Sequence, residues 1–214
     1  MQERHLSAID HLFVGLDSAL RGISSQTIRP ARNNPANGIP DAVLSPAERE
    51  LSAGLMRVNH AGEVAAQGLY QGHAAVARSG SIAAQMQSAA DEERDHLGWC
   101  EQRLAELDAA PSRLRPFWYA GAFAIGATSG VLGDRWSLGF VEETERQVEE
   151  HLTTHLGRLP ASDARSRAIV EQMRIEEQQH GAKASAAGAR KLPRIAVRMM
   201  RVAARVMTLT SYRI

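Results

Sequence analysis

The side chains best suited to bind metal ions occur in two copies of one short pattern, EExxH. The copies read EERDH at residues 92–96 and EEQQH at residues 176–180. On an α-helix, a glutamate three residues before a histidine lies on the same face, about one turn away, so both can reach one ion. Carboxylate oxygens together with imidazole nitrogens suit iron or manganese. The repeat therefore predicts a metal centre built from two similar halves, with His96 and His180 as its nitrogen ligands.

Each copy offers two glutamates that could be the oxygen ligand. Glu93 and Glu177 stand three residues before their histidines, while Glu92 and Glu176 stand four residues before them. Both spacings are compatible with one helix face, so spacing alone leaves the choice open. A single ExxH is common on exposed helices without a metal, whereas two copies in one chain are a much more specific signal.

The elements that must position these residues are predicted to be helices. Aromatic residues make up only 5% of the chain, and no run of alternating β-branched residues predicts a strand. Ser45, Pro46 and Glu48 form a capping box with proline at the first helical position, which predicts that a helix begins there. The expected helices span about residues 46–79, 81–107, 114–156 with a break near Gly133, 162 to the stretch 181–190, and 193 onward. Four long helices with short links predict an all-α, antiparallel four-helix bundle.

The two helices without an EExxH copy are expected to supply the remaining oxygen ligands. Ferritin-like di-iron bundles combine Glu-x-x-His from each of two helices with one glutamate from each of the other two. Glu63 stands among small and apolar neighbours, and Glu142 follows the apolar Leu138, Phe140 and Val141. Four carboxylates would neutralise two divalent cations in a buried core. Two metals about 3.5–4 Å apart can share carboxylates and bind dioxygen between them.

Charge and composition exclude several classes of partner and compartment. A formal net charge of +1 over 214 residues gives no global field that attracts nucleic acid. The single cysteine, Cys100, excludes an intramolecular disulfide framework and fits a reducing compartment. Residues 1–44 are predicted to hold an amphipathic helix over residues 6–20 and a loop, without a secretory signal, while residues 45–214 form the folded domain.

Two segments predict contact with a membrane surface. Residues 116–133 carry no charge, but their glycines make the stretch too weakly apolar to span a bilayer. The last helix carries arginines at spacings of four, three and four residues beside apolar side chains; these are Arg194, Arg198, Arg201 and Arg205. A basic amphipathic helix of this kind lies on an anionic membrane. The alternatives are a buried core helix for residues 116–133 and an ordinary bundle helix at the C-terminus.

Several longer stretches resemble the COQ7 family, the di-iron hydroxylases of demethoxyubiquinone in ubiquinone biosynthesis. The resemblance rests on RVNHAGEVAA, EERDHL, LRPFWYAGAFAIGA, VEETE and EEQQH, and runs from about residue 45 to the C-terminus. It implies a ferritin-like bundle with extra helices at the membrane interface, two iron ions, dioxygen as co-substrate and NADH as a candidate electron donor. It also implies the ligand set, and so favours the glutamates three residues before each histidine: Glu63, Glu93, His96, Glu142, Glu177 and His180.

The two membrane-contact segments and the resemblance together predict a location and partners. A membrane-dissolved quinone, the membrane surface and other ubiquinone-biosynthesis proteins are the expected partners, and the expected place is the cytoplasmic face of the bacterial inner membrane, without a span. Iron storage or peroxide scavenging is the alternative on the same fold, and hydroxylation of a tRNA base is another. Neither alternative needs the apolar and basic segments. His151 and His155, also on the third helix, are predicted to be solvated surface residues.

Overall fold

The computed structural model describes residues 29–214, so the amphipathic helix expected over residues 6–20 lies outside the described residues. The described part of the chain contains helices and no strand, as the composition predicts. The helices are α2 (Pro46–Val76), α3 (Gly80–Glu106), α4 (Arg115–Val131), α5 (Asp134–Arg158), α6 (Ala164–Ala186) and α7 (Arg194–Ser211).

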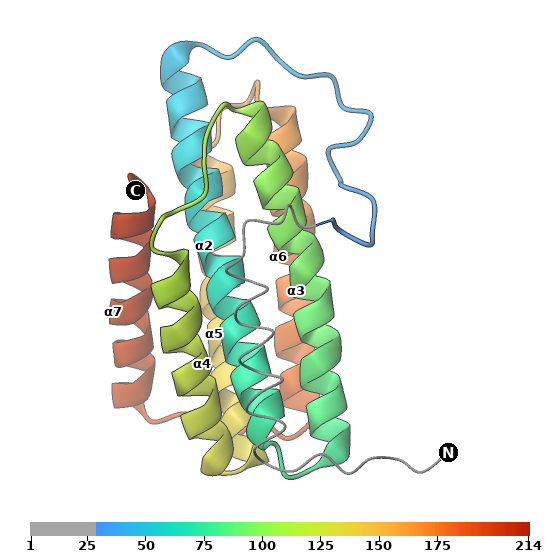
Figure 1. Cartoon of the computed structure of the whole chain (residues 1–214), viewed down its shortest axis with the longest axis vertical. Coiled ribbons are helices and arrows are strands. Elements are labelled where there is room, and N and C mark those ends of the chain that lie inside the picture. The colour runs from blue at the N-terminus through green and yellow to red at the C-terminus, as the bar shows by residue number, and fades with distance from the viewer. Residues whose placement is uncertain (1–28) are drawn as a thin grey trace.

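Four long helices, α2, α3, α5 and α6, form the bundle, and α4 and α7 lie along one side of it (Figure 1). α3 returns antiparallel to α2, and α6 returns antiparallel to α5. Between these two hairpins the chain runs back along the bundle through α4, so α3 and α5 point in the same direction. A long crossover of this kind is the connection found in ferritin-like bundles.

Local sequence signals set the ends of these helices where they were predicted. The backbone N–H of Glu48 donates to Ser45 Oγ at 3.3 Å, and the Ser45 N–H donates back to Glu48 Oε2 at 2.8 Å, so the predicted capping box is confirmed. The predicted break in the third stretch falls at Gly133, whose φ of 117° is a conformation that favours glycine. This break separates α4 from α5.

Glycines let α4 lie directly against the backbone of α2. They are spaced four apart on both helices, at Gly68 and Gly72 and at Gly126 and Gly130. A Cβ atom on Gly72 would collide with the carbonyl oxygen of Phe123, and one on Gly126 with that of Leu69. Backbones can approach this closely only where no side chain intervenes, so α4, which holds most of the uncharged stretch, is a helix packed on the bundle.

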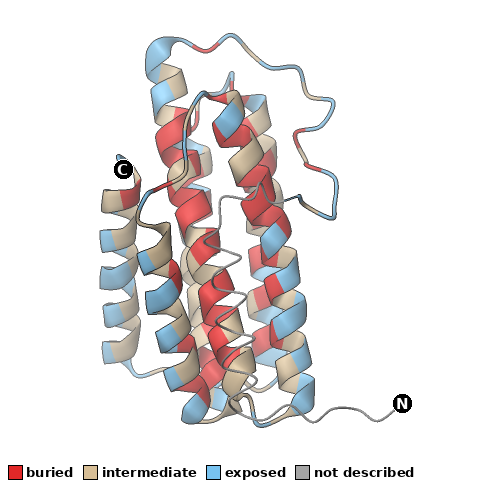
Figure 2. Cartoon of the chain, in the orientation of Figure 1, coloured by how far each residue is buried: buried red, intermediate tan, exposed pale blue. Residues whose placement is uncertain are grey.

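Two of the three apolar clusters of the described residues are shared by all four bundle helices, with a polar layer between them. One cluster is built around Met56, Trp99, Leu152 and Met173 and the other around Tyr70, Met86, Leu138 and Ala184, so each bundle helix contributes to both. Figure 2 shows buried residues along the inner faces of these helices. The layer between the two clusters is where the EExxH copies lie.

Candidate metal centre

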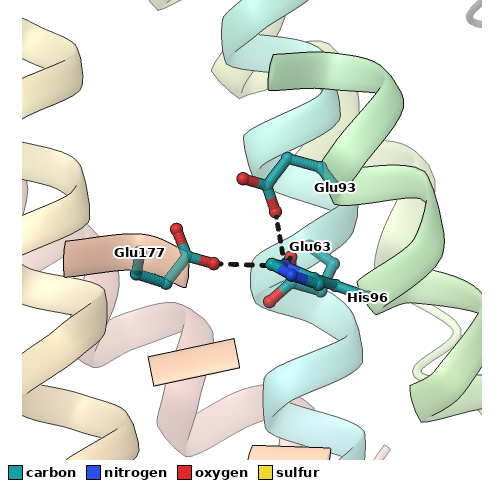
Figure 3. Close-up of side chains that lie close together, drawn as sticks. All are labelled: Glu63, Glu93, His96 and Glu177. Carbon is teal, nitrogen blue, oxygen red and sulfur yellow. Dashed lines mark hydrogen bonds and ion pairs between the residues drawn. The ribbon is translucent and has the colours of Figure 1, made fainter. Parts of the chain in front are cut away.

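Six buried acidic and histidine side chains meet in this layer, in two overlapping groups. The first group is Glu63, Glu93, His96 and Glu177, drawn in Figure 3, and the second is Glu93, Glu145, Glu177 and His180. Within each group, one potential ligand atom of every residue lies within 4.8 Å of the others. Glu93 and Glu177 belong to both groups. Each of the four bundle helices therefore contributes one glutamate, and α3 and α6 add the histidines.

In each of the two shared glutamates, one carboxylate oxygen faces His96 and the other faces His180. His96 Nδ1 lies 3.0 Å from Glu93 Oε2 and 3.3 Å from Glu177 Oε1. His180 Nδ1 lies 3.0 Å from Glu93 Oε1 and 3.5 Å from Glu177 Oε2. Glu63 approaches only the first histidine, with Oε2 3.6 Å from His96 Nδ1. This is the arrangement that lets two carboxylates bridge two adjacent metal ions.

The structure brings together five of the six residues predicted as ligands, but leaves Glu142 outside the cluster. Glu145 takes its place on α5: it is buried, whereas Glu142 is only partly buried and lies outside both groups. The buried stripe of α5 runs through Leu138, Val141, Glu145 and Leu152 at helical spacing. Glu142 is the residue directly after Val141, and one step along a helix rotates a side chain by about 100°, away from this stripe.

The first glutamate of each EExxH copy reaches across to the histidine of the other copy. Glu176 Oε2 lies 2.6 Å from His96 Nε2, and Glu92 Oε2 lies 2.9 Å from His180 Nε2. A carboxylate at Nε2 holds the proton on that nitrogen and leaves Nδ1 free for a metal. The doubled glutamate thus has a physical reason, because one carboxylate faces the centre while its neighbour orients the opposite imidazole.

Several atoms that face the centre lack the partners that buried polar atoms require. Glu63 Oε2, Glu93 Oε1, Glu177 Oε2 and His180 Nδ1 make no hydrogen bond. Two of these atoms, Glu93 Oε1 and His180 Nδ1, lie 3.0 Å apart but are not aligned as donor and acceptor. Unpaired buried polar atoms are uncommon and costly. Four carboxylates and two imidazoles with such atoms turned inward fit a pair of iron ions.

Burial and mutual charge shift the pKa values of the clustered side chains. Burial, and then the charge of Glu93, raises the pKa of Glu63 well above its usual range. Burial and the charge of Glu177 do the same to the pKa of Glu145. Burial opposes a charge on His180, but the adjacent carboxylates of Glu177 and Glu93 outweigh it and raise its pKa to about 12. Protons therefore balance the carboxylate charges of the metal-free protein, and binding metal must displace them.

The remaining histidines of α5 differ from the prediction. His155, expected to be solvated, is buried and its Nδ1 lies 2.7 Å from Asn59 Oδ1. His151 is partly buried, with its ring centroid 3.8 Å from that of His155. Burial lowers the pKa of His151 to about 4 and that of His155 to about 2, so both rings are neutral at neutral pH. His155 continues the buried stripe of α5 one turn beyond Leu152, a signal already present in the sequence.

A cavity of about 140 Å³ adjoins the second group. It is lined by His180, Glu92, Tyr70, Val141 and Lys183, among others. Tyr70 connects this wall to the centre, since its hydroxyl donates to Glu145 Oε1 at 2.5 Å. The cavity gives small molecules a place beside the histidine of α6.

Comparisons with known proteins agree with this geometry. Residues 50–211 match the model of the family described as "Ubiquinone biosynthesis protein COQ7". The chain belongs to the COQ7 family. The resemblance seen in the sequence is therefore confirmed over nearly the whole chain.

Similar members of the COQ7 family carry one name. The chain is 51% identical over 212 residues to the 3-demethoxyubiquinol 3-hydroxylase of Nitrosococcus oceani, covering 99% of both chains. It is 57% identical over 208 residues to the protein of the same name from Cupriavidus taiwanensis, covering 96% of this chain and all of the other. The bacterioferritin-related protein from Bacteroides fragilis, a dodecameric thioferritin, has a similar structure, with a TM-score of 0.54 and 17% identity over 63% of this chain and 82% of that one. This likeness confirms the ferritin-like fold.

Proposed function

We propose that this chain is a 3-demethoxyubiquinol 3-hydroxylase that uses dioxygen at a pair of iron ions. The observation that carries the proposal is the buried layer of four glutamates and two histidines, with two carboxylates shared between the groups. The relatives that span the same length bear the name of this reaction. Iron storage or peroxide scavenging is less well supported, because the bacterioferritin-related protein shares only the fold at 17% identity.

The residues of the centre would differ in which metal ion they hold. Glu93 and Glu177 would bridge the two ions, His96 and Glu63 would complete one position, and His180 and Glu145 would complete the other. The iron pair, when bound, supplies the activation of dioxygen. Orientation of the two imidazoles falls to the outer glutamates of α3 and α6, which hold their Nε2 atoms.

The reaction sets requirements for the rest of the protein. One oxygen atom of dioxygen replaces hydrogen at ring carbon 3 as a hydroxyl group, and the other leaves as water, which consumes two electrons and two protons. NADH is the proposed source of the electrons. The cavity beside His180 is lined by both apolar and polar side chains, including Met86, Val141 and Gln85, and is a suitable place for dioxygen or the edge of a quinol ring.

The substrate is expected to reach the protein from a membrane, and one side of the molecule has the surface for it. Among the described residues, nearly all large hydrophobic side chains that are exposed lie on α4, on α7 or just after them. Phe117 on α4 is 72% exposed and Met199 on α7 is 66% exposed. Both helices lie on the same side of the bundle (Figure 1), and Trp118 Nε1 of α4 donates to Ser211 Oγ of α7 at 3.0 Å.

The apolar face of α7 points away from the bundle. Its exposed stripe recurs at helical spacing and consists of Ile195, Met199, Val202, Val206 and Leu209. The exposed stripe of Arg194, Arg198, Arg201 and Arg205 runs beside it. An amphipathic helix that packed into a bundle would turn its apolar face inward, whereas a helix on an anionic bilayer turns that face and its arginines outward.

From this surface we infer a peripheral location on the cytoplasmic face of the bacterial inner membrane, with other proteins of ubiquinone biosynthesis as further partners. No helix between residues 29 and 214 has the length and apolarity to cross a membrane. The anionic lipids of that leaflet complement the arginines of α7.

Complementation tests the proposed reaction in a cell. A bacterial strain that lacks its own 3-demethoxyubiquinol hydroxylase should regain ubiquinone and respiratory growth when it expresses this chain, while the quinol precursor declines. The variant Glu177→Ala, expressed at the same level, should not restore either. If an expressed, iron-loaded protein leaves the precursor pool unchanged, the proposed function is wrong.

A further inference from the structure

The two halves of the centre are alike in their inner residues but differ in what holds their outer carboxylates. Glu176, which contacts His96, is about one-tenth exposed and receives a two-pronged contact from Arg32: Nη1 donates to Oε1 at 2.7 Å and Nη2 to Oε2 at 2.9 Å. Glu92, which contacts His180, is 34% exposed. Among the described residues, the lysine or arginine nearest to it is Lys183, whose Nζ lies 3.7 Å from Glu92 Oε1. One half is thus fixed by a guanidinium and the other faces solvent.

Arg32 comes from the loop before α2, and its guanidinium also contacts a second carboxylate and an aromatic ring, although its side chain is 40% exposed. Its Nε donates to Asp95 Oδ2 at 2.6 Å, and the backbone N–H of Ala31 donates to Asp95 Oδ1 at 2.6 Å. The guanidinium carbon lies 4.9 Å from the centroid of Trp99, whose ring lies 5.3 Å from that of His96. The planar guanidinium matches a carboxylate with two parallel hydrogen bonds, which fixes the orientation of Glu176 as well as its charge.

We propose that Arg32 is a positioning residue for His96, which makes the two metal positions inequivalent. By engaging both oxygens of Glu176, it keeps that carboxylate at Nε2 of His96 and prevents it from turning toward the metal. Among residues 29–214 no guanidinium contacts Glu92, so the imidazole of His180 is less constrained than that of His96.

This inference rests on the proposed two-iron centre, and the test separates the two. Protein loaded with ⁵⁷Fe(II) without oxygen is studied by Mössbauer spectroscopy, and iron affinity is measured by titration, with no substrate present. Wild-type protein should give two distinct iron signals. Arg32→Gln should shift one signal and weaken iron binding at that position about tenfold, the lower end of the effect of outer-shell partners. Arg32→Lys, which keeps the charge but loses the paired hydrogen bonds, should restore the wild-type signal and iron affinity only in part.

Three controls assign the effect. Glu176→Gln should alter the same signal as Arg32→Gln, and Glu92→Gln should alter the other one. Asn34, in the same loop as Arg32, donates from Nδ2 to Gln102 Oε1 and accepts from the backbone N–H of Ala36. Asn34→Ala removes both hydrogen bonds without touching Glu176, and should leave both signals unchanged. If Arg32→Gln gives the wild-type spectrum, or Asn34→Ala reproduces its change, the role of Arg32 is disproved. If wild-type protein binds no iron pair, the proposed centre itself fails.

Discussion

Replacing Glu145 by glutamine tests the geometry of the centre, because this residue belongs to only one of the two groups. Glu93 and Glu177 serve both halves, so losing either would damage both metal positions. Losing Glu145 removes a direct oxygen ligand beside His180 and leaves the group around His96 complete. Iron content should therefore fall from about two ions per chain to about one.

The size of the effect follows from the place of Glu145 in the site. Outer-shell residues typically change metal affinity 10–100-fold, and a direct ligand should exceed that range, so we expect a loss of more than about 100-fold, or about 2.8 kcal/mol, at this position. Glutamine keeps an oxygen that can accept from the hydroxyl of Tyr70, so the fold should persist. The assay is anaerobic loading with Fe(II), gel filtration and elemental analysis, with circular dichroism to verify the helices.

Glu142→Gln is the matched control, since this residue lies one helical turn from Glu145 on the same helix but outside the cluster. It should bind two ions with unchanged affinity. The reasoning is refuted if the Glu145 variant keeps two tightly bound ions while the Glu142 variant loses one.

Three further predictions concern charge, the membrane and packing. Burial and neighbouring charge raise the pKa values of Glu63 and Glu145, so iron binding should release protons and should weaken as the pH falls. Calorimetric titration in buffers of different ionisation enthalpy measures the protons released, and an iron affinity independent of pH would contradict the prediction. Changing the four arginines of α7 to glutamine should weaken binding to anionic vesicles by about 4 kcal/mol, at about 1 kcal/mol per arginine, with no effect on neutral vesicles, as vesicle sedimentation would report. Gly126→Leu should destabilise the protein by about 1–3 kcal/mol in chemical denaturation, because the new side chain would meet the backbone of α2. Gly121→Ala should leave stability unchanged, since the space around its Cβ is open. Equal stability of the two variants would argue against the close α2–α4 packing.

The sequence predicts the bundle well because its signals are local. The capping box at Ser45, the break at Gly133 and the apolar periodicity each depend on a few neighbouring residues, and the helix bounds differ from the prediction by only a few residues. The EExxH repeat is local in the same sense. It identifies two of the helices that face the centre and both histidines of the site.

What the sequence did not predict depends on helix rotation and on contacts between distant segments. The apolar residues just before Glu142 favour it as a ligand, but the full buried stripe from Leu138 to Leu152 passes through Glu145 instead. That stripe is visible only over a longer window of the sequence. The crossing of Glu92 and Glu176 to the opposite histidines requires the relative height of α3 and α6, which spacing within one helix does not contain. The contact of Arg32 with Glu176 joins residues 144 positions apart, from a loop without any periodic signal.

Labelled dioxygen tests the central claim most directly, namely that the buried glutamate and histidine layer supports hydroxylation of a quinol ring by molecular oxygen. Iron-loaded protein is incubated with 3-demethoxyubiquinol, a reductant and ¹⁸O₂, and the product is analysed by mass spectrometry. The account predicts a hydroxylated ring that carries one ¹⁸O atom, and no product from Glu177→Ala under the same conditions. Product that forms without dioxygen, or whose new oxygen comes from water, would contradict it.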